Sequence, residues 1–247
     1  DCQCSRAGVD DAQEVAMDIR LAGVSKYFHP DIVALEDAYL SIAQGEFVYF
    51  VGTTGSGKTT LMRLITRELI PSRGQITVGD KNLRKIRNSQ LPYFRRNIGV
   101  VFQDFKLLPN LTAWENVAFV LESMGMPSRM VKGRTDEVID QVGLWRRRFL
   151  YPPQLSGGEQ QRVAIARAMA NSPSIFIADE PTGNLDLHTA EDIMRLLLSL
   201  NAAGATVIMA THDQYLVDAY RQRVIELHEG RIVRDEEKGG YLIDGEL

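Results

Sequence analysis

Short apolar runs alternate with longer stretches of helical periodicity along most of the chain, and this alternation predicts an α/β fold. The apolar runs are rich in β-branched and aromatic residues, which is typical of strands. One run, EFVYFV, is continuously apolar after its first residue and indicates a strand buried on both faces. The expected strands are 17–24, 34–42, 46–51, 76–78, 98–102, 174–178, 205–210, 223–227 and 231–233.

The middle of the chain differs from its ends, because helical periods there run from about 114 to 170 with little strand signal. Helices are also expected at 57–69 and 187–200, and the last two strands are expected to form a hairpin that turns at Glu229 and Gly230. The pattern therefore predicts a single α/β domain with a helical insertion.

The predicted domain covers 17–234, and its helical subdomain is inserted at about 104–171. The first 16 residues are interpreted as a flexible tail. Residues 235–247, which begin with three acidic residues, are interpreted as a solvated acidic tail.

Composition narrows the function classes. The 247 residues are 45% hydrophobic, which is ample for one large domain. A formal net charge of −4 makes the chain a poor candidate for general nucleic-acid binding. No stretch reaches the roughly 20 apolar residues of a membrane-spanning helix, so we expect a cytoplasmic protein that meets a membrane only through another chain. Cys2 and Cys4, separated by one residue, are interpreted as incidental thiols.

A glycine-rich segment after the strand 46–51 carries a strong chemical signal. It matches the pattern G-x-x-x-x-G-K-[ST] between an expected strand and an expected helix, a context that argues against a chance match. Its glycines let backbone N–H groups curl around phosphate oxygens, and the positive end of the helix faces the same anion. Lys58 is expected to reach the β- and γ-phosphates, and Thr59 to hold Mg²⁺. The expected nucleotide-binding residues of this loop are Gly52, Thr53, Thr54, Gly55, Ser56, Gly57, Lys58, Thr59 and Thr60.

Two carboxylates end the apolar strand expected at 174–178. Asp179 is expected beside the phosphates, where it can bind Mg²⁺ directly or through water. Glu180 follows it, in a position to take a proton from the attacking water. Many strands end in acidic turns, so the signal is weak alone; together with the phosphate-binding loop it predicts nucleotide hydrolysis.

A second glycine-rich turn starts the helix expected after residue 160. It contains Ser156, Gly157, Gly158 and Glu159, and a serine with two glycines at a helix start can form an anion site. An ordinary serine-capped helix has the same local pattern. One phosphate-binding loop suffices for one nucleotide, so the turn taken alone favours the ordinary capped helix.

The run LSGGEQQR at 155–162 resembles the signature of the ABC ATPase family, and the other motifs follow in that family's order. The resemblance implies a P-loop, RecA-like α/β core with an N-terminal antiparallel β subdomain and an inserted α-helical subdomain. It also implies ATP and Mg²⁺ as ligands and a head-to-tail homodimer around two ATP molecules. In this family the signature turn of one subunit covers the ATP held by the other.

The resemblance implies roles for further residues. Gln103 matches a glutamine that contacts Mg²⁺ and the attacking water, Asp186 lies in the D-loop at the dimer interface, and His212 matches a switch histidine that contacts the γ-phosphate. Phe28 lies where the family stacks an aromatic ring on adenine, with Tyr27 as the neighbouring candidate. The expected catalytic residues are Glu180, His212, Gln103 and Lys58, and the expected metal ligands are Thr59, Gln103 and Asp179.

Residues 91–121, which include FRRNIGVVFQDFKLLP, are most similar to the FtsE group of cell-division ATPases. This resemblance implies an ATPase at the cytoplasmic face of the membrane that moves an FtsX-like transmembrane protein and so regulates peptidoglycan hydrolases. ATPases of lipoprotein-release and macrolide-export systems share the LLP and PTGNLD runs and are the nearest alternative. A nucleic-acid-associated ABC ATPase predicts tandem cassettes or long coiled-coil insertions, which this sequence lacks.

Apolar residues are dense in the segment after Gln103. Loops seldom expose so many without a partner, so part of this surface is expected to form a groove for a cytoplasmic helix of the FtsX-like protein. The alternative is that these residues pack under the helical subdomain. They are Phe105, Leu107, Leu108, Pro109, Leu111 and Trp114.

Overall fold

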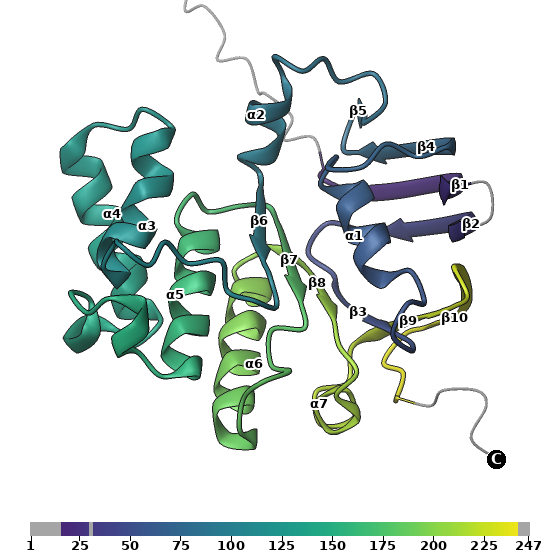
Figure 1. Ribbon diagram of the computed structural model, residues 1–247. Coiled ribbons are helices and arrows are strands. Elements are labelled where there is room, and N and C mark those ends of the chain that lie inside the picture. The colour runs from purple at the N-terminus through teal and green to yellow at the C-terminus, as the bar shows by residue number, and fades with distance from the viewer. Residues whose placement is uncertain (1–15, 30–31, 242–247) are drawn as a thin grey trace, which may run out of the picture.

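The computed structural model describes residues 16–29 and 32–241, which form two sheets with a helical lobe to one side (Figure 1). A six-stranded sheet has the order β10-β9-β3-β8-β7-β6, and a four-stranded antiparallel sheet has the order β2-β1-β4-β5. The strands are β1 (Ile19–His29), β2 (Ile32–Ile42), β3 (Phe47–Val51), β4 (Arg73–Val78), β5 (Lys81–Asn82), β6 (Ile98–Val101), β7 (Ile175–Asp179), β8 (Thr206–Ala210), β9 (Arg223–His228) and β10 (Arg231–Glu236).

Seven α-helices and two short 3-10 helices are present among the described residues. They are α1 (Lys58–Ile65), α2 (Leu91–Arg95), α3 (Ala113–Ser123), α4 (Ser128–Gln141), η1 (Trp145–Arg147), η2 (Pro152–Gln154), α5 (Gly157–Met169), α6 (Leu187–Ala202) and α7 (Gln214–Ala219).

The centre of the six-stranded sheet is buried, as its continuous apolar runs predict. Every residue of β3 and of β8 is buried. Since β3, β8 and β7 are parallel neighbours, their C-terminal ends meet at one edge, where Asp179 of β7 pairs with Ala210 of β8. The loops that follow these three strands therefore come together, and they carry most of the residues expected to bind nucleotide.

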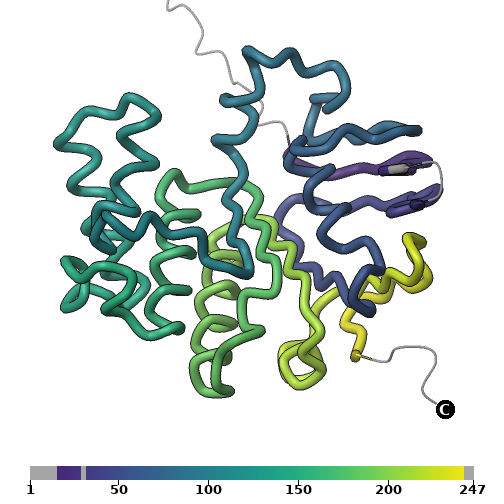
Figure 2. The backbone as a smooth tube through the Cα atoms, viewed as in Figure 1, coloured from purple at the N-terminus to yellow at the C-terminus, as the bar shows by residue number. Residues whose placement is uncertain are grey.

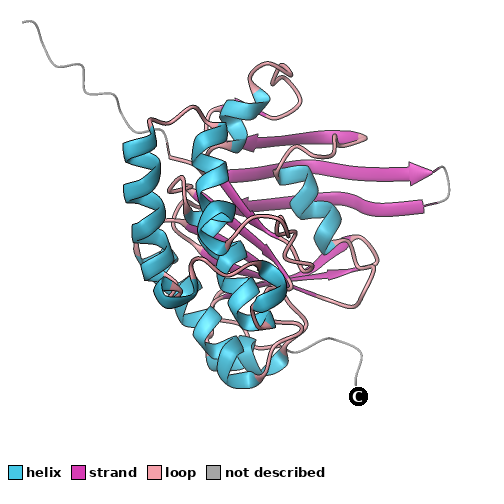
Figure 3. Cartoon of the chain, turned by 60° about the vertical axis from the view of Figure 1, so that its left-hand side comes forward, coloured by secondary structure: helices cyan, strands magenta, loops and turns pink. Residues whose placement is uncertain are grey.

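The helical lobe and the sheet share one hydrophobic core. The lobe, built from α3, α4 and α5, lies on the opposite side of the six-stranded sheet from the antiparallel strands (Figures 1 and 2). Its buried residues join a cluster that includes Tyr49, whereas Phe50, on the other face of β3, joins a second cluster with α1 and the antiparallel sheet. Figure 3 shows most of the helices on one side and the antiparallel strands extending from the other, with α1 packed on the strands.

Most expected elements are present, with differences at their ends. Helix α1 stops at Ile65, earlier than the predicted 57–69, and Arg67 just beyond it has a left-handed φ of 57°. The hairpin of β9 and β10 is confirmed, and Glu229 and Gly230 in its turn have φ values of 44° and 78°. The sequence did not predict β5, α2 or α7, which have two to six residues and are too short for a periodic pattern.

The acidic tail predicted from residue 235 is wrong at its start. Strand β10 continues to Glu236, and Arg223 donates hydrogen bonds of 2.7 Å to both carboxylate oxygens of Asp235. Arg234 donates to Glu236 at 3.1 Å. These arginines balance the negative charge and keep the segment in the sheet. The rest of this prediction concerns residues 237–247, of which 242–247 lie outside the described residues, as does the predicted N-terminal tail apart from Ala16.

Within the described ranges, no helix has both the length and the apolar content needed to cross a bilayer.

Candidate functional site

The phosphate-binding loop lies between β3 and α1 and has a backbone that only glycine can adopt at key points. Gly52, Gly55 and Gly57 have φ values of 136°, 84° and 110°. A Cβ at Gly52 would collide with the carbonyl of Leu227, and one at Gly57 would lie 2.7 Å from the carbonyl oxygen of Ala34. The loop is therefore shaped by neighbouring backbone as well as by its own turns.

Lys58 folds back over this loop instead of extending into solvent. Its Nζ donates to the carbonyl of Gly52 at 2.6 Å and to that of Thr53 at 3.1 Å. Burial lowers the pKa of Lys58, and the carboxylates of Glu180 and Asp179 partly oppose that shift. The ammonium thus lies at the loop with neutral carbonyls as its hydrogen-bond partners, which leaves its charge available to an anion.

One hydroxyl of the same loop is also unsatisfied. Ser56 Oγ is buried and has no hydrogen-bond partner among the described residues. These groups fit the phosphates of a nucleotide. The hydroxyl and the lysine ammonium can donate hydrogen bonds to phosphate oxygens, and the glycines let the backbone come close to them.

Thr59 and Asp179 bring two oxygen atoms together at the end of β7. Thr59 Oγ1 donates to Asp179 Oδ2 at 3.0 Å. Burial raises the pKa of Asp179; the nearby Glu180 adds to this shift, whereas the Thr59 hydrogen bond and Lys58 oppose it. A cation would stabilise the ionised form of this carboxyl.

This pair of oxygens fits a Mg²⁺ ion that also has phosphate and water ligands, and it does not fit a metal ion whose ligands all come from the protein. No cluster of three or more His, Cys, Asp or Glu side chains in the described part of the chain could enclose a metal ion. Mg²⁺ accepts oxygen ligands and is commonly held by one or two protein groups together with substrate phosphates and water. Thr59 and Asp179 supply such a partial set, with Gln103 lining the same hollow.

Glu180 has an unusual backbone for a residue with a side chain. Its φ is 50°, in the left-handed region, and its N–H donates to the carbonyl of Ala210 at 3.0 Å. His212 Nδ1 lies 2.7 Å from Glu180 Oε2, a buried oxygen that has no other polar partner among the described residues. A strained backbone held by its neighbours is frequent at catalytic positions, and here it turns the carboxylate towards the loop.

These residues line one hollow of about 300 Å³, so the structure brings most of the predicted site together. Phe28 is not part of that lining; its ring is 51% exposed and Lys26 Nζ lies 5.3 Å from the ring centre. Its predicted stacking on adenine stays a prediction. The lining consists of Ala34, Thr54, Gly55, Ser56, Gly57, Lys58, Thr59, Thr60, Gln103, Asp179, Glu180 and His212.

The second glycine-rich turn lies outside this hollow and begins α5 with a capping box. Ser156 Oγ accepts from the N–H of Glu159 at 3.3 Å, and the Glu159 carboxylate accepts from the N–H of Ser156 at 2.8 Å. The capped-helix interpretation is therefore correct locally. Ser156 and Gly157 are nevertheless exposed, with the positive end of the helix free to meet another molecule.

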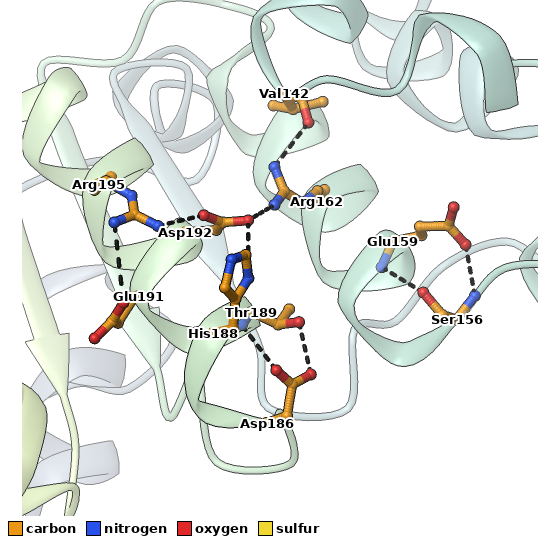
Figure 4. A network of polar contacts seen from close by, with 10 residues as sticks. All are labelled: Val142, Ser156, Glu159, Arg162, Asp186, His188, Thr189, Glu191, Asp192 and Arg195. Carbon is orange, nitrogen blue, oxygen red and sulfur yellow. Dashed lines mark hydrogen bonds and ion pairs between the residues drawn. The ribbon is translucent and has the colours of Figure 1, made fainter.

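This turn packs directly on the start of α6. Asp186, the N-cap of α6, accepts hydrogen bonds from the N–H of Thr189 at 3.0 Å and from its hydroxyl at 2.7 Å. Figure 4 shows both contacts. A Cβ added to Gly158 would lie 2.5 Å from Thr189 Cγ2. Asp186 thus acts within its own chain, and Gly158 is needed so that the signature turn and the D-loop can touch.

A chain of ion pairs continues this contact between α5 and α6. Arg162 donates to Asp192 at 2.6 Å and to the carbonyl of Val142 at 3.3 Å, and Asp192 also accepts from Arg195 at 2.5 Å (Figure 4). Glu191 accepts from the Tyr215 hydroxyl at 2.9 Å and so joins α6 to α7, the helix after His212. Sequence reasoning missed this network, because single charged residues on helices have no distinctive pattern.

Three comparisons agree on the kind of protein. Residues 35–183 match the ABC transporter family. The chain is 48% identical over 223 residues to the cell division ATP-binding protein FtsE of Bacillus subtilis (strain 168), covering 90% of this chain and 98% of that protein. It is 49% identical over 211 residues to FtsE of Mycobacterium tuberculosis (strain ATCC 25618 / H37Rv), covering 85% and 92%.

A solved structure is similar over almost the same extent. It is described as a dimeric, post-hydrolysis state of the ATP-binding cassette MJ0796 bound to ADP and Pi. It aligns with a TM-score of 0.82 and 39% identity, covering 90% of this chain and all of that chain.

The contact between Gly158 and Thr189 is testable by stability. Gly158→Ala is expected to lower the Tm by several degrees, because the new methyl meets Thr189 Cγ2. Adding Thr189→Ser removes that methyl, keeps the hydroxyl on Asp186, and should restore most of the loss in a thermal melt. Equal melting of the single and double variants would contradict the packing argument.

Asp179 is expected to reduce the stability of the nucleotide-free protein at neutral pH. A raised carboxyl pKa means that the folded state binds the proton of Asp179 more tightly than the unfolded state does. The free energy of unfolding therefore falls as the pH rises from the unfolded-state pKa through the folded-state pKa. Asp179→Asn should therefore raise the Tm relative to wild type, by an amount that grows as the pH rises above about 3.9, the ordinary pKa of an aspartate. The control is Asp140→Asn, which removes an exposed carboxylate of α4 outside the nucleotide hollow and should leave the Tm unchanged.

Proposed function

This chain belongs to the ABC transporter family and, within it, to the FtsE cell-division ATP-binding proteins, and we propose from this premise that it hydrolyses ATP as a homodimer to drive an FtsX-like membrane protein. Hydrolysis of ATP to ADP and phosphate follows from the family. The observation that carries the residue assignments is the hollow in which Lys58, Thr59, Asp179 and Glu180 converge.

The phosphate loop and Lys58 bind and orient the triphosphate. The ammonium already lies against the loop, and the phosphates would replace its carbonyl partners with full negative charges. Thr59 and Asp179 hold Mg²⁺, with Gln103 beside them. The metal, when bound, neutralises charge on the phosphate oxygens.

Glu180 is the general base in this proposal. Its carboxylate accepts a proton from the water that attacks the γ-phosphate. His212, 2.7 Å away, keeps that carboxylate oriented and is itself exposed enough to reach the phosphate. The left-handed backbone of Glu180 keeps the carboxylate at the end of β7, next to the Mg²⁺ ligands.

Closure of the site requires a second copy. The signature turn lies outside the nucleotide hollow of its own chain, and the start of α5 is exposed. A phosphate bound in that hollow would therefore not contact this turn within the same protomer. The turn consists of Ser156, Gly157, Gly158 and Glu159. The solved cassettes with a TM-score of 0.82 are described as dimeric. We infer a head-to-tail dimer in which each signature turn covers the ATP of the other subunit.

The FtsX-like partner places the protein at the cytoplasmic face of the membrane. The segment after Gln103 is the candidate contact, although part of it packs inwards: Phe105, Leu107 and Trp114 lie against the core, whereas Leu108 is 37% exposed. The relatives at 48% and 49% identity are FtsE proteins, which favours this role over an exporter or lipoprotein-release ATPase.

Glu180→Gln is expected to keep ATP affinity while lowering turnover by at least about 100-fold, since the amide cannot accept the proton. It should also stabilise an ATP-bound dimer, detectable by size-exclusion chromatography with light scattering. Lys58→Ala should instead weaken ATP binding itself, measured by calorimetry. Unimpaired hydrolysis by Glu180→Gln would remove Glu180 from the role of base.

Partner contact through the apolar segment is tested by Leu108→Asp. The variant should lose co-purification with a co-expressed FtsX-like protein while ATP binding stays unchanged, because Leu108 lies outside the nucleotide hollow. Met130→Asp, on an exposed residue of α4, is the matched control and should co-purify normally. Phe105→Asp is expected to lower the Tm as well, since Phe105 packs on the core.

A further inference from the structure

The turn between β9 and β10 packs against the phosphate-binding loop, although the two segments are far apart in the sequence. Gly230 N–H donates to the carbonyl of Ser56 at 3.0 Å, and Glu36 N–H of β2 donates to the carbonyl of Gly230 at 2.8 Å. Beside these bonds, the Arg231 and Glu36 side chains form an ion pair of 2.8 Å. The turn therefore joins the phosphate-binding loop to both sheets.

Backbone packs on backbone at this joint, because glycines stand at the points of closest approach. A Cβ on Gly57 would lie 2.7 Å from the carbonyl oxygen of Ala34, and a Cβ on Gly230 would lie 3.2 Å from the same oxygen. Gly230 also has a left-handed φ of 78°. A side chain at residue 230 would therefore push the turn or β2 out of place by a few tenths of an ångström.

The hydrogen bond from Gly230 fixes the orientation of one peptide unit in the loop. The Ser56–Gly57 peptide is trans, so its carbonyl and its N–H point in opposite directions. The Ser56 carbonyl points towards Gly230, which does not line the nucleotide hollow, whereas Gly57 does line it. The Gly57 N–H is therefore turned away from the β9–β10 turn and towards the nucleotide side of the loop.

The loop alone restrains this peptide weakly. Within the loop, Ser56 N–H donates to the carbonyl of Thr53 at 3.1 Å, which orients the peptide before Ser56 and not the one after it. Gly55 and Gly57 flank Ser56, and glycine permits many backbone angles. Ordering a flexible peptide on binding would weaken affinity, so a restraint from outside the loop favours tight binding.

We propose that Gly230 is a positioning residue for nucleotide binding, whose N–H holds the Ser56 carbonyl so that the Gly57 N–H faces the phosphates of ATP. A backbone N–H at such a loop is a donor to phosphate oxygens. This inference rests on the proposed function, in which the loop binds the triphosphate, and it extends the ATP site to the hairpin of β9 and β10. Gly230 acts through Ser56 and Gly57 and does not touch the nucleotide.

The test compares alanine substitutions at two glycines with nearly the same backbone, each in the full chain. Gly230→Ala should raise the Kd for ATP about tenfold, the loss of one hydrogen bond to a charged group, measured by calorimetry. Gly45→Ala is the matched control, because Gly45 has a φ of 80° and a Cβ there would meet no atom within 4 Å. Both variants should lower the Tm, since alanine is strained at this φ, but Gly45→Ala should bind ATP as wild type does.

A second substitution separates backbone strain from the contact with Ala34. Asparagine adopts left-handed φ values more readily than alanine, so Gly230→Asn should melt closer to wild type than Gly230→Ala does. It still carries a Cβ beside Ala34, so its Kd for ATP should rise about as much as that of Gly230→Ala.

The amide resonance of Gly57 gives a readout that a purely structural role would not move. In wild type, saturating Mg²⁺ and ADP should shift the Gly57 N–H resonance downfield, because its N–H donates to a charged phosphate oxygen. The shift should be smaller in Gly230→Asn and should match wild type in Gly45→Ala.

The outcomes separate this inference from the proposed function. If wild type binds no ATP, the proposed function is wrong and the inference falls with it. If wild type binds ATP and both Gly230 variants bind it equally well, or Gly45→Ala weakens binding as much as they do, the function stands and Gly230 serves only its own turn. A raised Kd with an unchanged Gly57 shift would also overturn the positioning role.

Discussion

The structure depends on charged and polar groups that the folded chain gathers at one sheet edge and balances only in part. Lys58 is buried with carbonyls as its hydrogen-bond partners, Asp179 is desolvated beside Glu180, and Ser56 Oγ has no partner among the described residues. In a protein interior such groups lower stability unless a ligand supplies the missing charge. A triphosphate with its Mg²⁺ carries both negative and positive charge. Its binding would therefore stabilise groups whose charge the folded chain alone does not compensate.

Helix α5 connects the parts of the molecule that face different neighbours. Its first turn carries Ser156 and Gly158, which meet the second subunit in the proposed dimer. Arg162, one turn further, joins it to α6 through Asp192, and Arg167 near its end holds the segment after Gln103. The signature turn, the D-loop and the Q-loop segment are therefore tied to one rigid element of a single protomer.

Much of this could be predicted from sequence, because the strongest signals are local. The phosphate loop, the paired carboxylates and the capped turn each have residues at fixed spacing, and buried strands of a parallel sheet read as continuous apolar runs. Gly158 shows where that approach ends: the turn is visible in the sequence, but the reason for its second glycine is Thr189, 31 positions on in the chain (189 − 158).

The Arg162 network could not be predicted for the same reason. Its members come from two helices far apart in the sequence, and each is an ordinary charged residue in its own segment. The acidic start of the C-terminal segment was misread because Arg223, on the neighbouring strand, neutralises Asp235. A run of charged residues predicts a solvent-exposed segment only when the fold places no oppositely charged side chain beside it.

The geometry of α5 gives this arrangement a mechanical meaning. Gly157 and Arg167 are ten positions apart on a regular helix, so roughly 15 Å of stiff rod separates the dimer-facing end from the end that grips Phe105 and Lys106. A pivot of ~5° about one end would carry the other by ~1.3 Å at that length. Such a shift is comparable to the helix displacements by which subunit interfaces switch. In the proposed dimer with its membrane partner, a small displacement at one end of this helix would therefore move the signature turn relative to the nucleotide of the other subunit.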